Sequence, residues 1–180
     1  MSDPFADLRA LEAHVWDRLA QGARDADDPF RFVTLATLGA DGPEARIVGL
    51  RRADRALREI EVHTDLRTAK VAALARDPRA ALLLWDAGAQ VQLRLSLDMR
   101  VVAADPTRWA RVPAASRPNY GTDPAPGTSI GAPEDLARTP DIARFAALVG
   151  LVRRIDMLSL AHDPHRRAVF EGDTAQWVAP

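Results

Sequence analysis

The sequence contains no cysteine, which excludes disulfide bonds, thiolate zinc sites and cysteine nucleophiles. Its net charge is only −1, so the chain has no general attraction to nucleic acid or to an acidic membrane surface. The longest apolar runs, residues 80–85 and 145–152, are far shorter than the roughly 20 residues that span a bilayer. Asp3 and Asp7 lie where a signal peptide would be basic and then apolar. We therefore expect a cytoplasmic protein with no nucleic-acid or membrane partner.

Familiar phosphate-binding and metal-binding motifs are also missing. The chain has no GxxxxGK[ST], GxGxxG or HExxH segment, and its carboxylates form no evident catalytic pair. His162 and His165 lie three residues apart beside Asp163, but further ligands are lacking, so we predict no metal site.

Alternation of apolar and polar residues is the main structural signal. Residues 90–97 alternate strictly, as a half-buried strand does. Further strands are predicted at residues 31–38, 44–51, 58–64, 79–85, 145–160, 166–171 and 174–178. Most are joined by short turns and show no βαβ rhythm, so residues 1–180 are predicted to form one mainly β domain, an antiparallel barrel with peripheral helices.

The remaining segments are predicted to be helices and one long loop. Asp3-Pro4 suits the start of a helix over residues 1–22, with Gly22 at its end. Shorter helices are expected from residue 67, over 105–112 and after Thr139-Pro140. Residues 113–133 hold five of the 13 prolines and three of the 10 glycines, which indicates a long and functional loop.

Residues 62–70 change from strand to helix spacing where cationic side chains gather. Arg67, Thr68 and Lys70 crowd the first turn of the predicted helix, where the positive end of the dipole disfavours cations. An anion between them would reverse this, since backbone N–H groups, a hydroxyl and two cations could converge on one phosphate. The alternative is a solvated helix start with incidental basic residues.

Three other polar groups are candidates for binding. Arg46 is predicted to share a strand face with Val48 and Leu50, where burial is costly unless the arginine is paired. Gln92 could offer a donor and an acceptor to a heteroaromatic edge, although its strand face could equally be solvent-exposed. The Ser-Arg-Pro-Asn-Tyr segment at 116–120 could bind substrate or could be ordinary turn chemistry.

An ordered set of segments resembles the pyridoxamine 5′-phosphate oxidase-like FMN-binding proteins. The set is Arg46-Ile-Val-Gly-Leu-Arg51, His63-Thr-Asp-Leu-Arg-Thr-Ala-Lys70, Asp77-Pro-Arg-Ala-Ala, Gln92-Leu-Arg-Leu, Ser116-Arg-Pro and Trp177-Val-Ala-Pro180. The resemblance covers nearly the whole chain from Phe30 onward. It implies an FMN-binding split barrel with a six-stranded antiparallel core, working as a homodimer with FMN at the subunit interface. It also implies an FMN-dependent oxidoreductase acting on a small molecule.

The resemblance assigns roles to individual residues. The phosphate of FMN would be held by Arg46, by Arg67 or Thr68, and by Lys70. The flavin ring would contact Ile47, Val48, His63, Thr64 and Gln92. A separate cationic site would hold a substrate phosphate, with Arg51, Ser116, Arg117, Tyr120, Arg166 and Arg167 as candidates. No catalytic residue is predicted, because the cofactor itself performs the hydride chemistry.

Departures from the family pattern concern the substrate. Arg51 stands where true pyridoxamine phosphate oxidases usually carry lysine, and Ala69 where they carry arginine. Leu158 and Val169 also replace an aromatic residue and an arginine. These departures favour the oxidase-related branch over vitamin B6 oxidation. The alternatives are a non-catalytic flavin-binding or haem-binding module, and a barrel that has lost its cofactor.

A homodimer is also predicted from the amount of apolar surface. Trp16, Trp85 and the apolar strands exceed what one small barrel is expected to bury.

Overall fold

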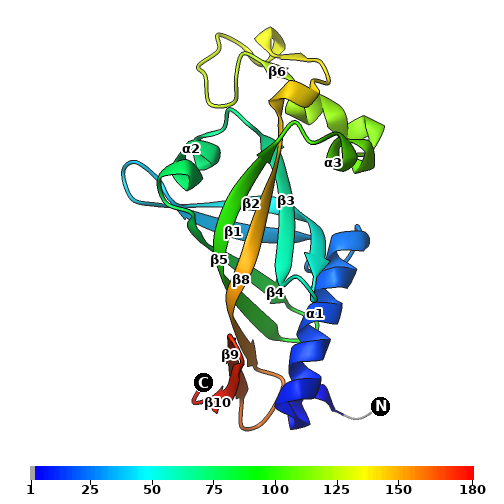
Figure 1. Cartoon of the computed structure of the whole chain (residues 1–180), viewed down its shortest axis with the longest axis vertical. Coiled ribbons are helices and arrows are strands. Elements are labelled where there is room, and N and C mark those ends of the chain that lie inside the picture. Colours follow the sequence, from blue (N-terminus) through cyan, green and yellow to red (C-terminus); the bar gives the residue numbers. More distant parts are fainter. Residues whose placement is uncertain (1–2) are drawn as a thin grey trace.

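The chain folds into a closed barrel of six antiparallel strands (Figure 1), as seen in the computed structural model, which describes residues 3–180. The barrel strands are β1 (Phe32–Leu38), β2 (Pro43–Asp54), β3 (Glu59–Asp65), β4 (Arg79–Asp86), β5 (Val91–Ala103) and β8 (Phe145–Ser159). Their order is β8-β3-β2-β1-β4-β5, and β5 pairs back with β8 to close the ring. The predicted mainly β fold with a six-stranded antiparallel core is confirmed.

Two strands, β5 and β8, are longer than the others and pair with each other along most of their length. β5 runs six residues beyond its predicted end, because its second half pairs with the first half of β8. Gly150 lies in this region, where an added Cβ would come within 2.5 Å of the sulfur of Met99. The second half of β8 pairs with β9 (Arg166–Glu171), which forms the predicted terminal hairpin with β10 (Thr174–Val178).

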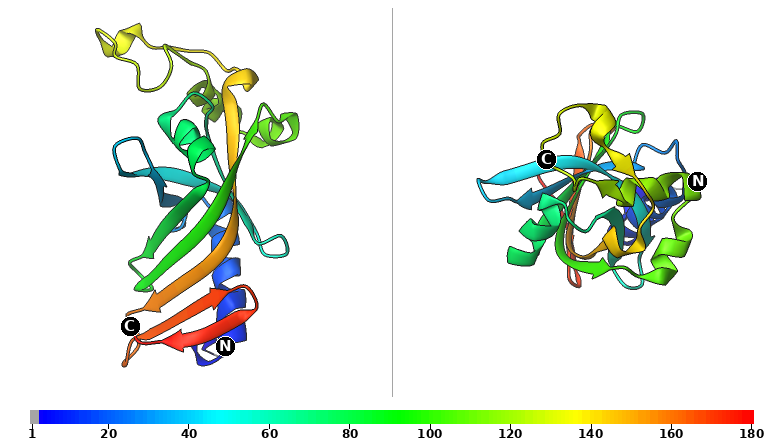
Figure 2. Two further views of the ribbon diagram at one scale, coloured as in Figure 1. Left: turned by 60° about the vertical axis from the view of Figure 1, so that its left-hand side comes forward. Right: turned by 90° about the horizontal axis from the view of Figure 1, so that it is seen from above.

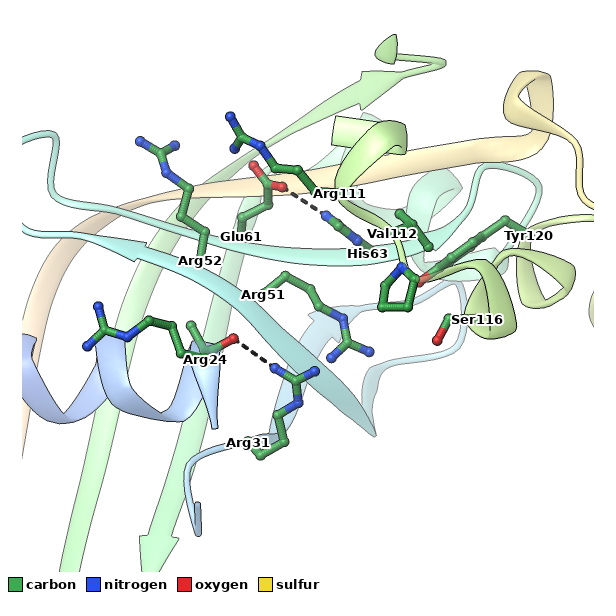
Figure 3. A pocket seen from close by; sticks show the side chains of 12 residues that line it. Arg24, Arg31, Arg51, Arg52, Glu61, His63, Arg111, Val112, Ser116 and Tyr120 are labelled. Carbon is green, nitrogen blue, oxygen red and sulfur yellow. Dashed lines mark hydrogen bonds and ion pairs between the residues drawn. The ribbon is translucent and has the colours of Figure 1, made fainter. Parts of the chain in front are cut away.

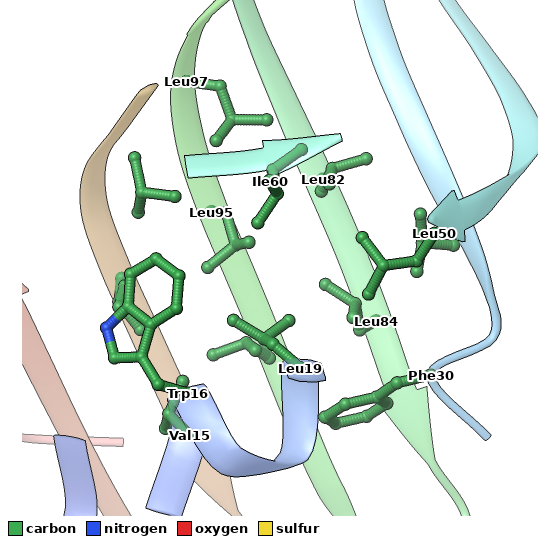
Figure 4. Packing of buried hydrophobic residues seen from close by; sticks show 14 of the residues in the cluster. Val15, Trp16, Leu19, Phe30, Leu50, Ile60, Leu82, Leu84, Leu95 and Leu97 are labelled. Carbon is green, nitrogen blue, oxygen red and sulfur yellow. The ribbon is translucent and has the colours of Figure 1, made fainter. Parts of the chain in front are cut away.

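The barrel interior is filled by alternate strand residues and by one helix (Figure 4). Leu93 and Leu95 of β5 are buried, as the alternation predicted. Helix α1 (Leu8–Arg24) lays Trp16 and Leu19 over the same core. Trp16 is only 2% exposed, so a single chain buries this side chain, and Trp16 does not support the predicted homodimer.

The N-terminal helix begins later than predicted. Asp3 caps a separate 3-10 turn, η1 (Pro4–Ala6), and Asp7 caps α1 by accepting a hydrogen bond from the amide of Ala10. The helix continues past Gly22 to Arg24, so the predicted bounds of 1–22 are wrong at both ends. Met1 and Ser2, the first residues of that prediction, lie outside the described residues.

The other helices are short and lie at the barrel rim. α3 (Pro106–Arg111) occurs where the sequence predicted it, whereas α2 (Ala69–Arg76) begins two residues later than predicted, so Thr68 is its N-cap and Arg67 precedes it. The predicted helix after Thr139-Pro140 is a 3-10 turn, η4 (Ile142–Arg144), and Asp141 caps it instead. None of the helices within residues 3–180 is long and apolar enough to cross a membrane.

The segment predicted as a loop over residues 113–133 is partly regular and extends further. It contains η2 (Ala114–Tyr120), a two-stranded ribbon of β6 (Thr122–Asp123) and β7 (Ala137–Arg138), and η3 (Pro133–Asp135). The ribbon region projects beyond one end of the barrel (Figure 2). Residues 127–131 fit the GxSxG pattern, but they lie in irregular chain rather than at the strand-to-helix turn that a nucleophilic serine requires.

Candidate functional site

An opening between β2 and β3 brings together three residues predicted to hold the phosphate, Arg46, Thr68 and Lys70, and one predicted to contact the flavin ring, Thr64. β2 pairs with β3 only from Leu50 onward, while residues 43–49 pair with β1 alone. α2 starts beside this opening, directly after β3. The side chains at the opening are Arg46, Thr64, Thr68 and Lys70: the ammonium of Lys70 lies 3.1 Å from the hydroxyl of Thr64, which lies 3.2 Å from that of Thr68.

Lys70 is a half-buried cation that faces another cation. Burial lowers the pKa of Lys70, the charge of Arg46 lowers it further, and Asp65 opposes this only in part. Within residues 3–180, Lys70 forms no ion pair with a carboxylate. A half-buried ammonium that has only a hydroxyl as its partner and a second cation nearby is unfavourable in isolation and becomes favourable when an anion binds.

Arg46 differs from Lys70 because a carboxylate already neutralises it. Its Nη2 donates to Glu44 at 2.6 Å, and its Nη1 donates to the hydroxyl of Thr37 at 2.7 Å. Arg46 is therefore paired, as a partly buried arginine was expected to be. The carboxylate of Glu44 is 44% exposed and lies on the same strand, so an incoming anion could displace it from the guanidinium.

Arg67 does not point into this cluster. Its Nε and Nη2 donate to the carboxylate of Asp65, and Nη2 also donates to the backbone oxygen of Thr122 at 2.7 Å. Burial alone would raise the pKa of Asp65, but the hydrogen bonds from Arg67 outweigh it and lower that pKa. Arg67 thus ties the start of α2 to the β6 ribbon, and Thr68 is the residue of this pair that lies at the opening.

A pocket of about 280 Å³ lies on the outer side of β2 and β3 (Figure 3). The end of α1, α3 and η2 form its other walls. It brings together four residues that the sequence predicted, Arg51, His63, Ser116 and Tyr120. It also contains five charged residues that the sequence did not predict, Arg24, Arg31, Arg52, Glu61 and Arg111.

A β-bulge places two consecutive arginines in this pocket. The β2–β3 register shifts between Leu50 and Arg52, so Arg51 is an extra residue on β2. Such a bulge interrupts the regular alternation of faces, which allows Arg51 and Arg52 to line the same pocket. The guanidinium of Arg51 lies over Gly49, where an added Cβ would approach it to 2.6 Å, so a side chain at position 49 would displace this guanidinium.

The inner wall of the pocket is a fixed hydrogen-bonded chain on β3. The Nε2 of His63 lies 2.8 Å from one oxygen of Glu61, and Arg108 donates to the other oxygen at 2.8 Å. Burial raises the pKa of Glu61, but these two partners outweigh it and lower that pKa. The ring of His63 stands edge-on to Phe145 at 4.9 Å, which leaves the imidazole little freedom to rotate.

The other predicted site residues lie away from both places. Arg117 donates to the backbone of Val112 and stacks over Trp109, behind the pocket wall. Arg166 pairs with Asp3, and Arg167 pairs with Asp156, both on the terminal hairpin. The predicted substrate residues therefore do not all lie at one site within a single chain.

The outer face of β1, β2 and β4 is apolar and flat. Thr34 of β1 lies between Ile47 and Leu83, and Ala36 lies between Ala45 and Ala81. Ile47 is 64% exposed, Leu83 42% and Trp85 46%. We call these seven residues the apolar face. Gln92 pairs with Trp85 at the edge of this face, so Gln92 borders it.

Comparison with known proteins places the chain in a family. A family model described as the pyridoxamine 5′-phosphate oxidase FMN-binding domain matches residues 13–103, just over half of the chain. This chain belongs to that family. A search of curated proteins finds no match.

Solved structures with the same fold align with most or all of this chain. A pyridoxamine 5′-phosphate oxidase-related FMN-binding protein from Nostoc punctiforme has 22% identity and a TM-score of 0.75, with 96% of each chain covered. PhzG from Burkholderia lata, solved with tetrahydrophenazine-1-carboxylic acid, has 18% identity and a TM-score of 0.76, covering 100% of this chain and 98% of its own. A haem-binding protein from Mycobacterium smegmatis has 19% identity and a TM-score of 0.53, covering 86% of this chain and 58% of its own.

The family match includes the opening but only part of the pocket. Residues 13–103 contain Arg46, Thr64 and Lys70, whereas Ser116 and Tyr120 lie beyond the matched region. The matched region therefore contains the strands that build the opening, and Ser116 and Tyr120 of η2, outside that region, complete the pocket.

Proposed function

We propose that this protein binds FMN and acts as an oxidoreductase on a small molecule. The observation that carries the proposal is the convergence of Arg46 and Lys70, with the hydroxyls of Thr64 and Thr68, at an opening in the barrel. A phosphate dianion needs two or three charge-assisted donors, and this group supplies them. The family match supports a flavin rather than another phosphate ester.

The residues at the opening also suit the rest of the cofactor. On the side of β2 that faces β3, residues 46–49 have no strand partner within the described chain. The N–H and C=O groups of Ile47 point to this side and are thus available to a heteroaromatic edge, while those of Val48 point to β1. When bound, FMN supplies hydride transfer, while the protein holds the phosphate and orients the substrate.

A homodimer is part of the proposal. The apolar face exposes the large side chains of Ile47, Leu83 and Trp85 beside small alanines, which suits contact with a second copy. Gln92 borders this face, far from the Arg46 opening along the sheet, so it would meet the flavin of a second copy rather than its own. Arg166 and Arg167 lie on the terminal hairpin and would likewise need a second copy to reach a substrate.

The pocket beside His63 is the proposed substrate site. Arg51, Ser116 and Tyr120 offer one cation and two hydroxyls there. Burial raises the pKa of Tyr120, and the charge of Arg51 opposes the shift, so the phenol stays protonated near neutral pH and can donate a hydrogen bond.

The test is identification of the cofactor in protein purified from its expression host. We expect a flavin absorption spectrum and release of FMN on denaturation, at one molecule per chain by mass spectrometry. A Soret band would support haem instead, and a colourless protein that does not take up added FMN would contradict the proposal. Oxygen uptake with pyridoxamine phosphate then separates vitamin B6 oxidation from other substrates.

A further inference from the structure

The pocket holds an excess of positive charge in a chain that is nearly neutral overall. Five of its lining residues are arginines, Arg24, Arg31, Arg51, Arg52 and Arg111, whereas the net charge of the whole chain is −1. The one acidic residue in the lining is Glu61, and His63 and Arg108 already occupy both of its oxygens. The arginines therefore present charge that this carboxylate does not compensate.

Two of the arginines form an inner pair. Figure 3 shows the guanidinium groups of Arg31 and Arg51 pointing toward one another, with Ser116 beside them. The Nη1 of Arg31 is held by the backbone oxygens of Ala23 at 2.8 Å and Leu50 at 3.1 Å. Within residues 3–180, neither guanidinium forms an ion pair with a carboxylate. Burial, and then the charge of Arg51, lower the pKa of Arg31, as expected for two cations that face each other.

The remaining arginines form an outer group. Figure 3 places Arg52 and Arg111 near Glu61 and Arg24 at the end of α1, and all three lie away from Ser116. Arg52 donates to Asp54 at 2.5 Å, so its charge is compensated. Arg24 and Arg111 are exposed and have no carboxylate partner within residues 3–180. The uncompensated charge thus lies in two separate places.

We propose that the pocket binds an organic dianion that carries two separate acidic groups. One group lies between Arg31 and Arg51 and accepts hydrogen bonds from the Ser116 and Tyr120 hydroxyls, and the other lies at Arg111. The pocket volume of about 280 Å³ suits a small molecule. A single small anion at the inner pair would leave the outer arginines without a partner. This inference rests on the proposed function only for the identification of the dianion as the substrate.

Isothermal titration calorimetry with simple acids tests the proposal directly. The probes are the straight-chain dicarboxylates from malonate to adipate, the monocarboxylates of equal length, and inorganic phosphate. Each is titrated into FMN-loaded and FMN-free protein. We expect one dicarboxylate length to bind at least tenfold more tightly than its matched monocarboxylate.

Two variants and one control locate the binding groups. Arg31→Gln removes one of the two inner charges but keeps an amide donor for the oxygen of Ala23, and Arg111→Gln removes an exposed outer charge that forms no ion pair within residues 3–180. Each should reduce dicarboxylate affinity to the level of the monocarboxylate. Arg9→Gln, at the other end of α1, should change nothing. Thermal unfolding of each variant reports whether it is folded.

Four results would overturn the inference. These are equal binding of dicarboxylates and monocarboxylates, phosphate binding as tight as the best dicarboxylate, no binding of any anion, and an unchanged preference in Arg111→Gln. FMN affinity is measured on the same samples by flavin fluorescence. Dicarboxylate binding without FMN binding would refute the proposed function and leave the pocket assignment intact. FMN binding without dicarboxylate binding would refute the pocket assignment and leave the proposed function intact.

Discussion

Replacement of Lys70 by methionine should change FMN affinity and protein stability in opposite directions. Methionine keeps most of the length and apolar volume of lysine but removes the charge. In the FMN-free protein, the half-buried ammonium faces Arg46 and has only the Thr64 hydroxyl as a partner. Its removal relieves burial of a charge and repulsion between two cations, so the melting temperature of the FMN-free protein should rise.

In the FMN complex, the same change removes a charge-assisted hydrogen bond to the phosphate. Such a bond contributes roughly 1.5–3 kcal/mol, which corresponds to a loss of about ten- to a hundred-fold in FMN affinity. Riboflavin lacks the phosphate, so its affinity should stay nearly unchanged. Fluorescence titrations of FMN-free protein with each flavin measure both affinities, and differential scanning calorimetry measures the stability.

The control is Arg76→Met, which removes a cation from the last turn of the same helix. It should leave both flavin affinities at the wild-type value. If Lys70→Met weakens riboflavin as much as FMN, or lowers the melting temperature of the FMN-free protein, then Lys70 has a structural role and the phosphate assignment is wrong.

Three further outcomes are expected. Glu44→Gln removes the carboxylate that competes for Arg46, so FMN affinity should increase several-fold while riboflavin affinity stays constant, and an unchanged FMN affinity would remove Arg46 from the phosphate site. Folding lowers the pKa of Glu61 below 4.5. The ionised carboxylate therefore stabilises the protein fully above pH 4.5, and this stabilisation is lost as the pH falls through the folded pKa. Acid titration by circular dichroism should show that Glu61→Gln loses stability less steeply than the wild type. Leu83→Arg, at the centre of the apolar face, should shift a dimer to a monomer in sedimentation velocity, and a wild type that is monomeric at micromolar concentration would contradict the proposed dimer.

The strands could be predicted from the sequence because their burial follows local alternation. Leu93 and Leu95 face the core just as the pattern of apolar residues requires. The extension of β5 to Ala103 could not be predicted, because its second half is a strand only through pairing with the distant start of β8. The start of α1 was predicted wrongly because Asp3 and Asp7 are both good caps, and local sequence does not decide between them.

Some residues of the candidate site could likewise be predicted from local sequence, and others could not. Lys70 and Thr68 could be found from one stretch of sequence, since a strand leads directly into a helix there. The role of Arg67 could not be predicted, because its partner Thr122 comes from a ribbon 55 residues further along the chain. Arg31 and Arg111 carry no signal of their own, and the pocket they share exists only where the end of α1, β2 and α3 meet.

β2 contributes an arginine to each of two cationic sites, the opening and the pocket. Arg46 and Arg51 lie five residues apart, and the bulge at Arg51 interrupts the alternation of faces between them, so that Arg46 lies at the opening and Arg51 lines the pocket. At about 3.3 Å per residue they are separated by roughly 16 Å along β2, with residues 47–49, which pair with β1 but not with β3, between them. Each arginine meets a second cation, Lys70 on the inner side and Arg31 on the outer side. One strand thus offers two separate anion sites, so a cofactor phosphate and an acidic substrate could be held at the same time without competing for the same donors.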